Sequence, residues 1–134
     1  MNKKEFLKSL DKVYCRLGHG IHGVGVFAIR NIPKGVDPFF DPTPGKWISV
    51  TPKELEGQPE EIKKLINDFC PLQNGKYWVP DHGMNSIAVG YYLNHSKAPN
   101  MIAVRDGEAF VTKRSIKKGE ELFSDYETYD DVGL

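Results

Sequence analysis

Three stretches of the sequence combine residue types that could carry out chemistry. Residues 23–28 read GVGVFA, residues 94–100 read NHSKAPN, and residues 119–126 read GEELFSDY. A glycine-rich stretch lets the backbone approach a ligand closely, amide and imidazole groups can bond a ligand or a neighbouring backbone, and a tyrosine supplies a phenol. Taken singly, each stretch also fits an ordinary structural role as a bend, a turn or a core strand.

Two familiar kinds of site fit these residues poorly. The GxGxxA spacing of residues 23–28 matches a dinucleotide-binding fingerprint, which requires a helix to follow the strand. Here residues 26–29 continue as a strand pattern and lead into a proline turn. His95 and Ser96 are adjacent, so their side chains point apart and do not form a nucleophilic pair. We therefore expect neither a nucleotide-binding βαβ unit nor a serine nucleophile.

The spacing of cysteines and histidines does not suggest a metal site. Cys15 and Cys70 lie far apart, and neither belongs to a CxxC pair. No close HxxxH spacing occurs among the four histidines, which are His19, His22, His82 and His95. We expect no metal ligands and two reduced, largely buried thiols.

Short strands are predicted to position these stretches. Apolar and β-branched runs bounded by glycine or proline indicate strands at residues 13–17, 24–30, 76–79, 101–104, 109–112 and 121–124. The Asp106-Gly107 dipeptide predicts a hairpin between two of them. Residues 30–35 and 114–119 share Arg, Ile, Lys and Gly at matching offsets, which we interpret as a repeated structural corner.

One helix is predicted, from about residue 59 to residue 69. Its apolar side chains recur at helical spacing on one face, and they are Ile62, Leu65, Ile66 and Phe69. Pro71 ends it, and prolines exclude residues 41–45 from any regular element. The resulting fold class is mostly β with one helix.

Length and composition limit the function classes. The 134 residues fit a single domain, and 40% hydrophobic residues exclude a disordered chain. The 18 basic residues balance the 18 acidic ones, which argues against a protein that mainly grips nucleic acid. No apolar run is long enough to span a membrane, and residues 1–10 lack the apolar core of a secretory signal. We expect a protein that is not secreted, in the cytoplasm or the nucleus.

The balanced charge conceals an asymmetry along the chain. The first third is rich in lysine and arginine, whereas the last fifteen residues contain no base and six acids: Glu120, Glu121, Asp125, Glu127, Asp130 and Asp131. Such a strip is either a solvated surface or a rim that attracts a basic partner. A basic first third also leaves nucleic-acid binding open as an alternative, although we expect no direct contact with nucleic acid.

Taken in order, the three stretches resemble the motifs of the SET domain of protein lysine methyltransferases. Residues 23–25 are similar to the family's first glycine motif, residues 94–100 to its NHSxxPN motif, and residues 121–126 to its ELxxDY motif. The likeness covers residues 13–129, and it looks closest to small viral and bacterial SET proteins. It implies a β-clip of short sheets with a C-terminal pseudoknot.

The resemblance implies one SET domain over residues 1–134, with a variable insert at about residues 41–80. No zinc-binding domain before or after the SET core is expected, because the cysteines of that tail are missing. The short tail leaves three readings open: full activity, completion of the pocket by a partner or homodimer mate, and a weakly active or inactive module that binds peptide or cofactor.

The family's roles transfer to this sequence as expectations. S-adenosylmethionine would be the cofactor, S-adenosylhomocysteine the product, and a lysine-containing basic protein or peptide the substrate. Tyr126 would be the catalytic tyrosine. The cofactor would be bound by His22, Gly23, Val24, Gly25, Asn94, His95, Tyr126 and Tyr129, with the Tyr129 ring stacked on adenine. The substrate channel would be formed by Tyr91, Tyr92, Phe123 and Ser124. Ser124 stands where many relatives carry the Phe or Tyr associated with methylation degree, so that degree is open.

Overall fold

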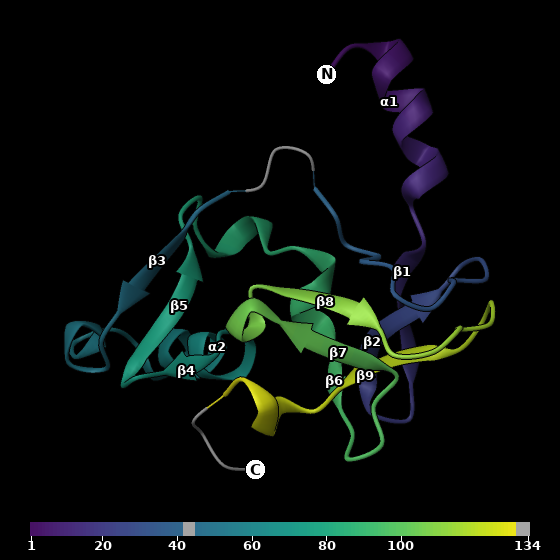
Figure 1. Cartoon of the computed structure of the whole chain (residues 1–134). Helices are drawn as coiled ribbons and strands as arrows, with labels where there is room; N and C mark the ends of the chain where they lie inside the picture. Colours follow the sequence, from purple (N-terminus) through teal and green to yellow (C-terminus); the bar gives the residue numbers. More distant parts are fainter. Residues whose placement is uncertain (42–44, 131–134) are drawn as a thin grey trace.

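Three small β-sheets form the body of the protein in the computed structural model, which describes residues 1–41 and 45–130 (Figure 1). The first sheet has the order β1 (Cys15–Gly20), β2 (Gly23–Ala28), β9 (Glu121–Ser124) and β6 (Asn94–His95). The second has the order β3 (Trp47–Val50), β5 (Lys76–Pro80) and β4 (Leu72–Gln73), and the third is the β7 (Met101–Val104) and β8 (Ala109–Thr112) hairpin. The predicted mostly β class of short sheets is confirmed.

Strand β9 lies between β2 and β6 and so joins the three sequence motifs. On one side it runs antiparallel to β2, with Leu122 opposite Val26. On the other side it runs parallel to β6, with Phe123 opposite Asn94. The last strand of the chain therefore places the glycine motif and the NHSxxPN motif on its two flanks.

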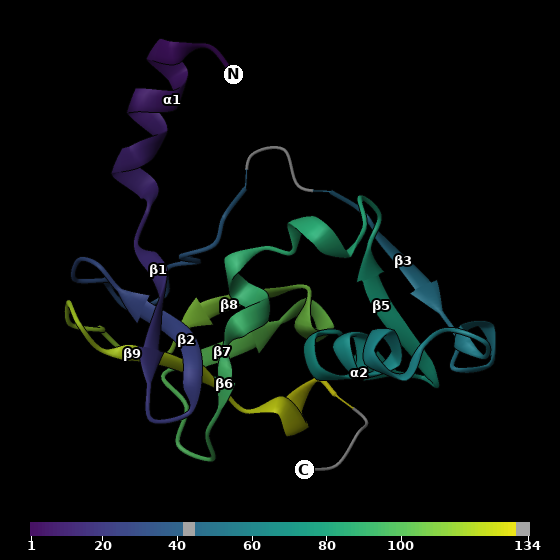
Figure 2. The ribbon, with the colours of Figure 1, turned by 180° about the vertical axis from the view of Figure 1, so that it is seen from behind.

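Two α-helices occur in the described residues, one more than predicted. Helix α2 (Glu60–Phe69) has the predicted bounds within one residue. Helix α1 (Lys3–Ser9) was not predicted; none of its residues is buried, and its apolar side chains Phe6 and Leu7 are exposed. Its N-terminus is capped by Asn2, whose side-chain oxygen accepts a hydrogen bond from the Glu5 amide at 2.8 Å. Both views show α1 pointing away from the sheets (Figures 1 and 2).

Strand β1 begins at Cys15, two residues later than predicted. Residues 10–12 form a turn of 3-10 helix, and the Val13 N–H still donates to the Leu10 carbonyl at 3.2 Å, so the strand starts after it. The Arg30 guanidinium donates hydrogen bonds to the carbonyls of Leu10 and Asp11 and so holds this turn against the body.

The described part of the segment predicted to be an insert lies beside the first sheet (Figure 1). It contains β3, α2, β4 and β5, and its buried residues Ile66, Cys70 and Val79 pack together.

Both cysteines are buried and unpaired, as predicted. Residues 42–44, which include two of the prolines used in the prediction, lie outside the described residues, as does Asp131. After β9, residues 125–130 run from the first sheet towards β4 (Figure 2).

The repeated corner predicted from the sequence is present, and its two copies pair with each other. The Ile32 amide donates to the Ile116 carbonyl at 2.8 Å, and the Ile116 amide donates to the Ile32 carbonyl at 2.8 Å. Both isoleucines are 1% exposed and belong to the main core. The two corners therefore join the segment that follows β2 to the segment that precedes β9.

Replacing Ile32 by alanine tests this tie. We expect the Ile32→Ala variant to lose about 2–5 kcal/mol of the free energy of unfolding, because the cavity left in a packed core cannot fully collapse. Ile21→Ala is the matched control, since Ile21 is 93% exposed, and it should change that free energy by less than about 0.5 kcal/mol. Denaturant titration measures both, and equal effects would contradict the core assignment.

Candidate functional site

The three motifs meet around Tyr126. The Tyr126 backbone N–H donates to Nδ1 of His95 at 3.1 Å, across 31 residues of sequence. The Asn94 side-chain amide donates to the Val24 carbonyl at 3.1 Å. The expectation that Asn94, His95 and Tyr126 lie together is thus confirmed. The His95 ring therefore anchors the backbone of the turn that carries Tyr126.

Gly25 is needed for packing at the centre of this arrangement. The Asn94 amide also donates to Oε2 of Glu121 at 2.9 Å. A Cβ added to Gly25 would lie 2.4 Å from that oxygen and 2.9 Å from the Asn94 nitrogen. Any side chain at Gly25 would therefore displace the Asn94–Glu121 pair.

The neighbouring backbone at Gly23 is open. Gly23 has a φ of +83°, and a Cβ placed there would meet no atom within 4 Å. The His22 ring lies edge-on to Phe123, with ring centroids 6.0 Å apart. A ligand can therefore approach the bare backbone at this turn, beside the aromatic face of His22.

Tyr126 is held as a neutral phenol. Its hydroxyl donates a hydrogen bond to the Leu93 carbonyl. Burial raises the pKa of Tyr126 to about 12, and the negative charge of Asp130 adds to this effect. The phenol therefore stays protonated throughout the physiological range and can orient a neighbouring group without adding charge.

Asn100 is a structural residue of the site that sequence reasoning did not assign. Its side-chain amide donates to the Glu121 carbonyl at 2.9 Å, and its side-chain oxygen accepts from the Phe123 amide at 2.8 Å. Asn100 is only 5% exposed, and its side chain bonds to the backbone of β9 as a neighbouring strand would. The sequence feature that could have identified Asn100 is its position as the last residue of the NHSxxPN motif.

A cavity of about 190 Å³ opens beside Tyr126 and Leu93, between the insert and the β7–β8 hairpin. Of the predicted channel and cofactor residues, Tyr91, Tyr126 and Tyr129 line it. Its other aromatic walls, which sequence reasoning missed, are Phe39, Trp47, Phe69 and Phe110. Four carboxylates also line it, from Asp37, Asp68, Glu108 and Asp130. No lysine or arginine occurs among the described lining residues, so the cavity is aromatic with an acidic character.

The remaining predicted channel residues lie elsewhere. Tyr92 packs against Phe69, with ring centroids 5.1 Å apart, and Phe123 faces His22. Ser124 is fully buried beneath the cavity, and its Oγ lies 2.8 Å from the Tyr129 hydroxyl. Tyr129, which we expected to stack on adenine, lies in the cavity wall, where burial raises the pKa of its hydroxyl.

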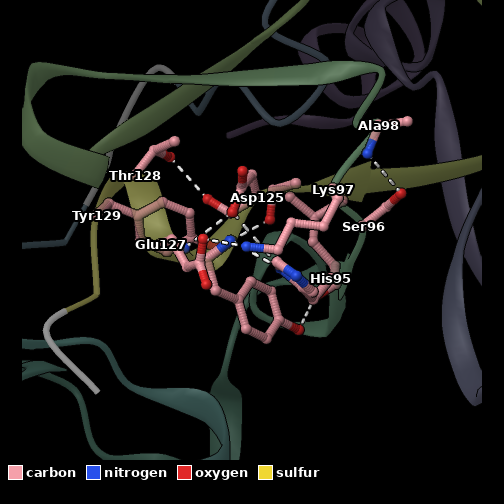
Figure 3. Close-up of polar contacts among 11 residues, drawn as sticks. His95, Ser96, Lys97, Ala98, Asp125, Glu127, Thr128 and Tyr129 are labelled. Atoms are coloured by element: carbon pink, nitrogen blue, oxygen red, sulfur yellow. Dashed lines mark hydrogen bonds and ion pairs between the residues drawn. The ribbon is translucent and has the colours of Figure 1, made fainter. Parts of the chain in front are cut away.

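Polar contacts fasten the turn that carries Tyr126 to the NHSxxPN segment (Figure 3). The Lys97 ammonium forms an ion pair with Glu127. The Asp125 side chain caps the following 3-10 turn by accepting from the Glu127 amide at 3.0 Å. These contacts are exposed, so each contributes little stability, and their main effect is on the position of the turn.

Two further observations concern ligand and membrane chemistry. Within the described residues, no group of three or more His, Cys, Asp or Glu side chains is arranged to hold a metal ion. Across residues 1–41 and 45–130, no helix has both the length and the apolar character that crossing a bilayer requires.

Comparison with known proteins identifies the family of the site. Residues 23–127 match the family model described as the SET domain. The chain is also similar to a crystal structure of a Plasmodium falciparum protein described as a candidate histone methyltransferase, with a TM-score of 0.54 and 18% identity over 84% of this chain and 92% of that one. At that identity the likeness concerns the fold alone. None of the curated proteins compared with the chain matches it significantly.

Alkaline titration tests the burial of Tyr126. A tyrosine whose folded pKa lies above the unfolded value of 10 adds stability below pH 10, and this contribution disappears as the pH rises through about 12. We expect Tyr126→Phe to remove a tyrosinate absorbance step near pH 12 and to flatten the fall in unfolding free energy above pH 10. Loss of a step near pH 10 instead would show that Tyr126 is solvated.

Proposed function

Because the chain belongs to the SET-domain family, we propose that it transfers a methyl group from S-adenosylmethionine to the side-chain amine of a lysine in a protein substrate. Members of this family are usually protein lysine methyltransferases. The cofactor, the substrate and the roles of individual residues are the parts of this proposal that go beyond family membership.

The position of Tyr126 carries the proposal. Its backbone N–H donates to His95 of the NHSxxPN motif, and Tyr126 also lines the aromatic cavity. Tyr126 and Tyr129 both belong to the predicted cofactor-binding group and to the cavity lining, and the Tyr126 N–H also links the cavity to that motif. A methyl transfer needs two reactants to meet in line at one point, and this arrangement supplies such a meeting point.

The residues of the glycine motif and the NHSxxPN motif could hold S-adenosylmethionine in part. The bare backbone at Gly23 leaves room for the cofactor's amino-acid end, and the backbone of Asn94 and His95 would bind near its adenine. The Asn94 side-chain amide is already engaged by Val24 and Glu121, so it would act mainly by keeping that backbone in place. When bound, the cofactor supplies a methyl group activated by a sulfonium.

The cavity is suited to preparing a lysine amine. A lysine with a pKa near 10.4 must lose a proton to act as a nucleophile, which costs about 4 kcal/mol at pH 7.4. Removal from water between Trp47, Tyr91 and Tyr126 lowers that cost by disfavouring the ammonium form, whereas the carboxylates that line the cavity act in the opposite direction. The neutral Tyr126 phenol and the Leu93 carbonyl would then orient the amine.

The charge around the cavity favours a basic substrate. Asp37, Asp68, Glu108 and Asp130 surround it from four separate segments of the chain. Such a field attracts a peptide with basic residues next to its target lysine and raises the association rate at low salt. We therefore propose a lysine in a basic protein segment as the substrate.

A methyl-transfer assay tests the proposal. The full chain is incubated with S-adenosylmethionine labelled in its methyl group and with a pool of basic proteins. We expect transfer by the unmodified protein and a loss of about 10²-fold or more in Tyr126→Phe, the size of effect expected when an orienting group is removed. Tyr92→Phe is the matched control, because Tyr92 packs against Phe69, and it should retain activity.

Equal transfer by the unmodified protein and Tyr126→Phe would remove Tyr126 from the mechanism. Saturable binding of S-adenosylmethionine in calorimetry without any transfer would indicate a binding module with the SET fold.

A further inference from the structure

The two repeated corners form one firmly held surface, which has no part in the proposed reaction. Residues 30–35 and 113–119 make up this surface, which we call the corner surface. Their backbones pair with each other, and the Asn31 side-chain oxygen also accepts a hydrogen bond from the Lys118 amide at 2.9 Å. Both views show the two loops side by side at the end of the molecule away from the insert (Figures 1 and 2). Side chains on this surface are therefore presented at fixed positions.

The charged side chains of the corner surface are all basic. Its residues include six bases and no acid. All six bases are exposed, and they are Arg30, Lys34, Lys113, Arg114, Lys117 and Lys118. The repeat thus carries more than turn chemistry, because it gathers positive charge from two distant parts of the chain.

The two arginines have structural partners, whereas the lysines do not. Arg30 donates to the carbonyls of Leu10 and Asp11, and Arg114 forms an ion pair with Glu120 at 3.1 Å. No ion pair within residues 1–41 and 45–130 involves any of the four lysines, which are Lys34, Lys113, Lys117 and Lys118. Like charges held together on one surface repel each other, and an anionic partner would relieve this repulsion.

The composition of the corner surface indicates which kind of anion it fits. It contains no aromatic residue, so it offers no platform on which the bases of a single strand could stack. Its two isoleucines are buried, which leaves little apolar surface for the core of a protein interface or for insertion into a membrane. Contact with the phosphates of a duplex requires only charge at the surface.

We propose that the corner surface binds the phosphate backbone of double-stranded nucleic acid without regard to base sequence. The zero net charge of the chain does not oppose this, because the acids are placed elsewhere. Four carboxylates line the cavity, and they would repel phosphates from that side of the molecule. The proposal is independent of the proposed function, since binding to a duplex needs neither cofactor nor methyl transfer.

Fluorescence anisotropy with a labelled DNA duplex of about 20 base pairs, long enough to span several phosphates, tests the proposal. Because four lysines would displace counterions, we expect a plot of log association constant against log salt concentration to have a slope of about −3 to −4. Affinity should thus fall about 100-fold between about 50 and 200 mM NaCl. Replacing all four lysines by glutamine should weaken binding at least about tenfold at the lower salt and bring the slope close to zero.

A second set of four exposed lysines provides the matched control. Lys46, Lys53, Lys64 and Lys76 belong to the insert, and their replacement by glutamine changes the net charge by the same amount. This variant should keep the affinity of the unmodified protein within about threefold, because only the overall charge has changed. Equal losses in the two variants would show that overall charge alone matters, and would overturn the assignment to the corner surface.

Three other results would also overturn the inference. The first is no duplex binding at about 50 mM NaCl with protein at about 100 μM, a concentration at which even weak non-specific binding is detected. The second is an equal loss when the lysines of residues 3–12 are replaced, which would assign the nucleic acid to the N-terminal segment. The third is tighter binding to a single strand, or to phosphatidylserine vesicles at equal phosphate concentration, than to the duplex.

Discussion

The pairing of β9 with two strands at once is the constraint on which the rest of the structure depends. An antiparallel contact with β2 and a parallel contact with β6 satisfy its backbone on both edges. Asn100 adds two further hydrogen bonds, to the Glu121 carbonyl and from the Phe123 amide. Because buried backbone groups must find partners, β9 has few alternatives to this position. Its location then fixes where the chain beyond Ser124 can go.

That chain carries both tyrosines of the proposed site. Immediately after β9, the turn at Tyr126 is held by His95, and Tyr129 is held by Ser124 and Gln73. The insert and the hairpin close around these two side chains and form the cavity between them. The geometry of the proposed site is therefore a consequence of strand pairing, and the acidic residues around it would provide an electrostatic field without direct contact with the reacting atoms.

Much of the fold could be predicted from the sequence because it follows local patterns. Periodicity located α2, turn dipeptides located the hairpin, and matching offsets located the corners at Ile32 and Ile116. Helix α1 was not predicted, and none of its residues is buried. The position of Tyr129 in the cavity wall was not predicted either. Its partners Gln73 and Ser124 belong to separate strands, and no local sequence pattern indicates that these strands come together. Motif resemblance brought Asn94, His95 and Tyr126 together correctly, but it could not identify Trp47 or Phe110 as cavity walls.

Native-state hydrogen exchange tests most directly the claim that β9 is the element on which the site depends. If it is, the Phe123 amide, bonded to Asn100, should exchange only through global unfolding, with an opening free energy equal to that from denaturant titration. The Glu5 amide at the exposed start of α1 provides the reference for local opening. Exchange of Phe123 at the rate of Glu5, with the core at Val26 still protected, would contradict the account.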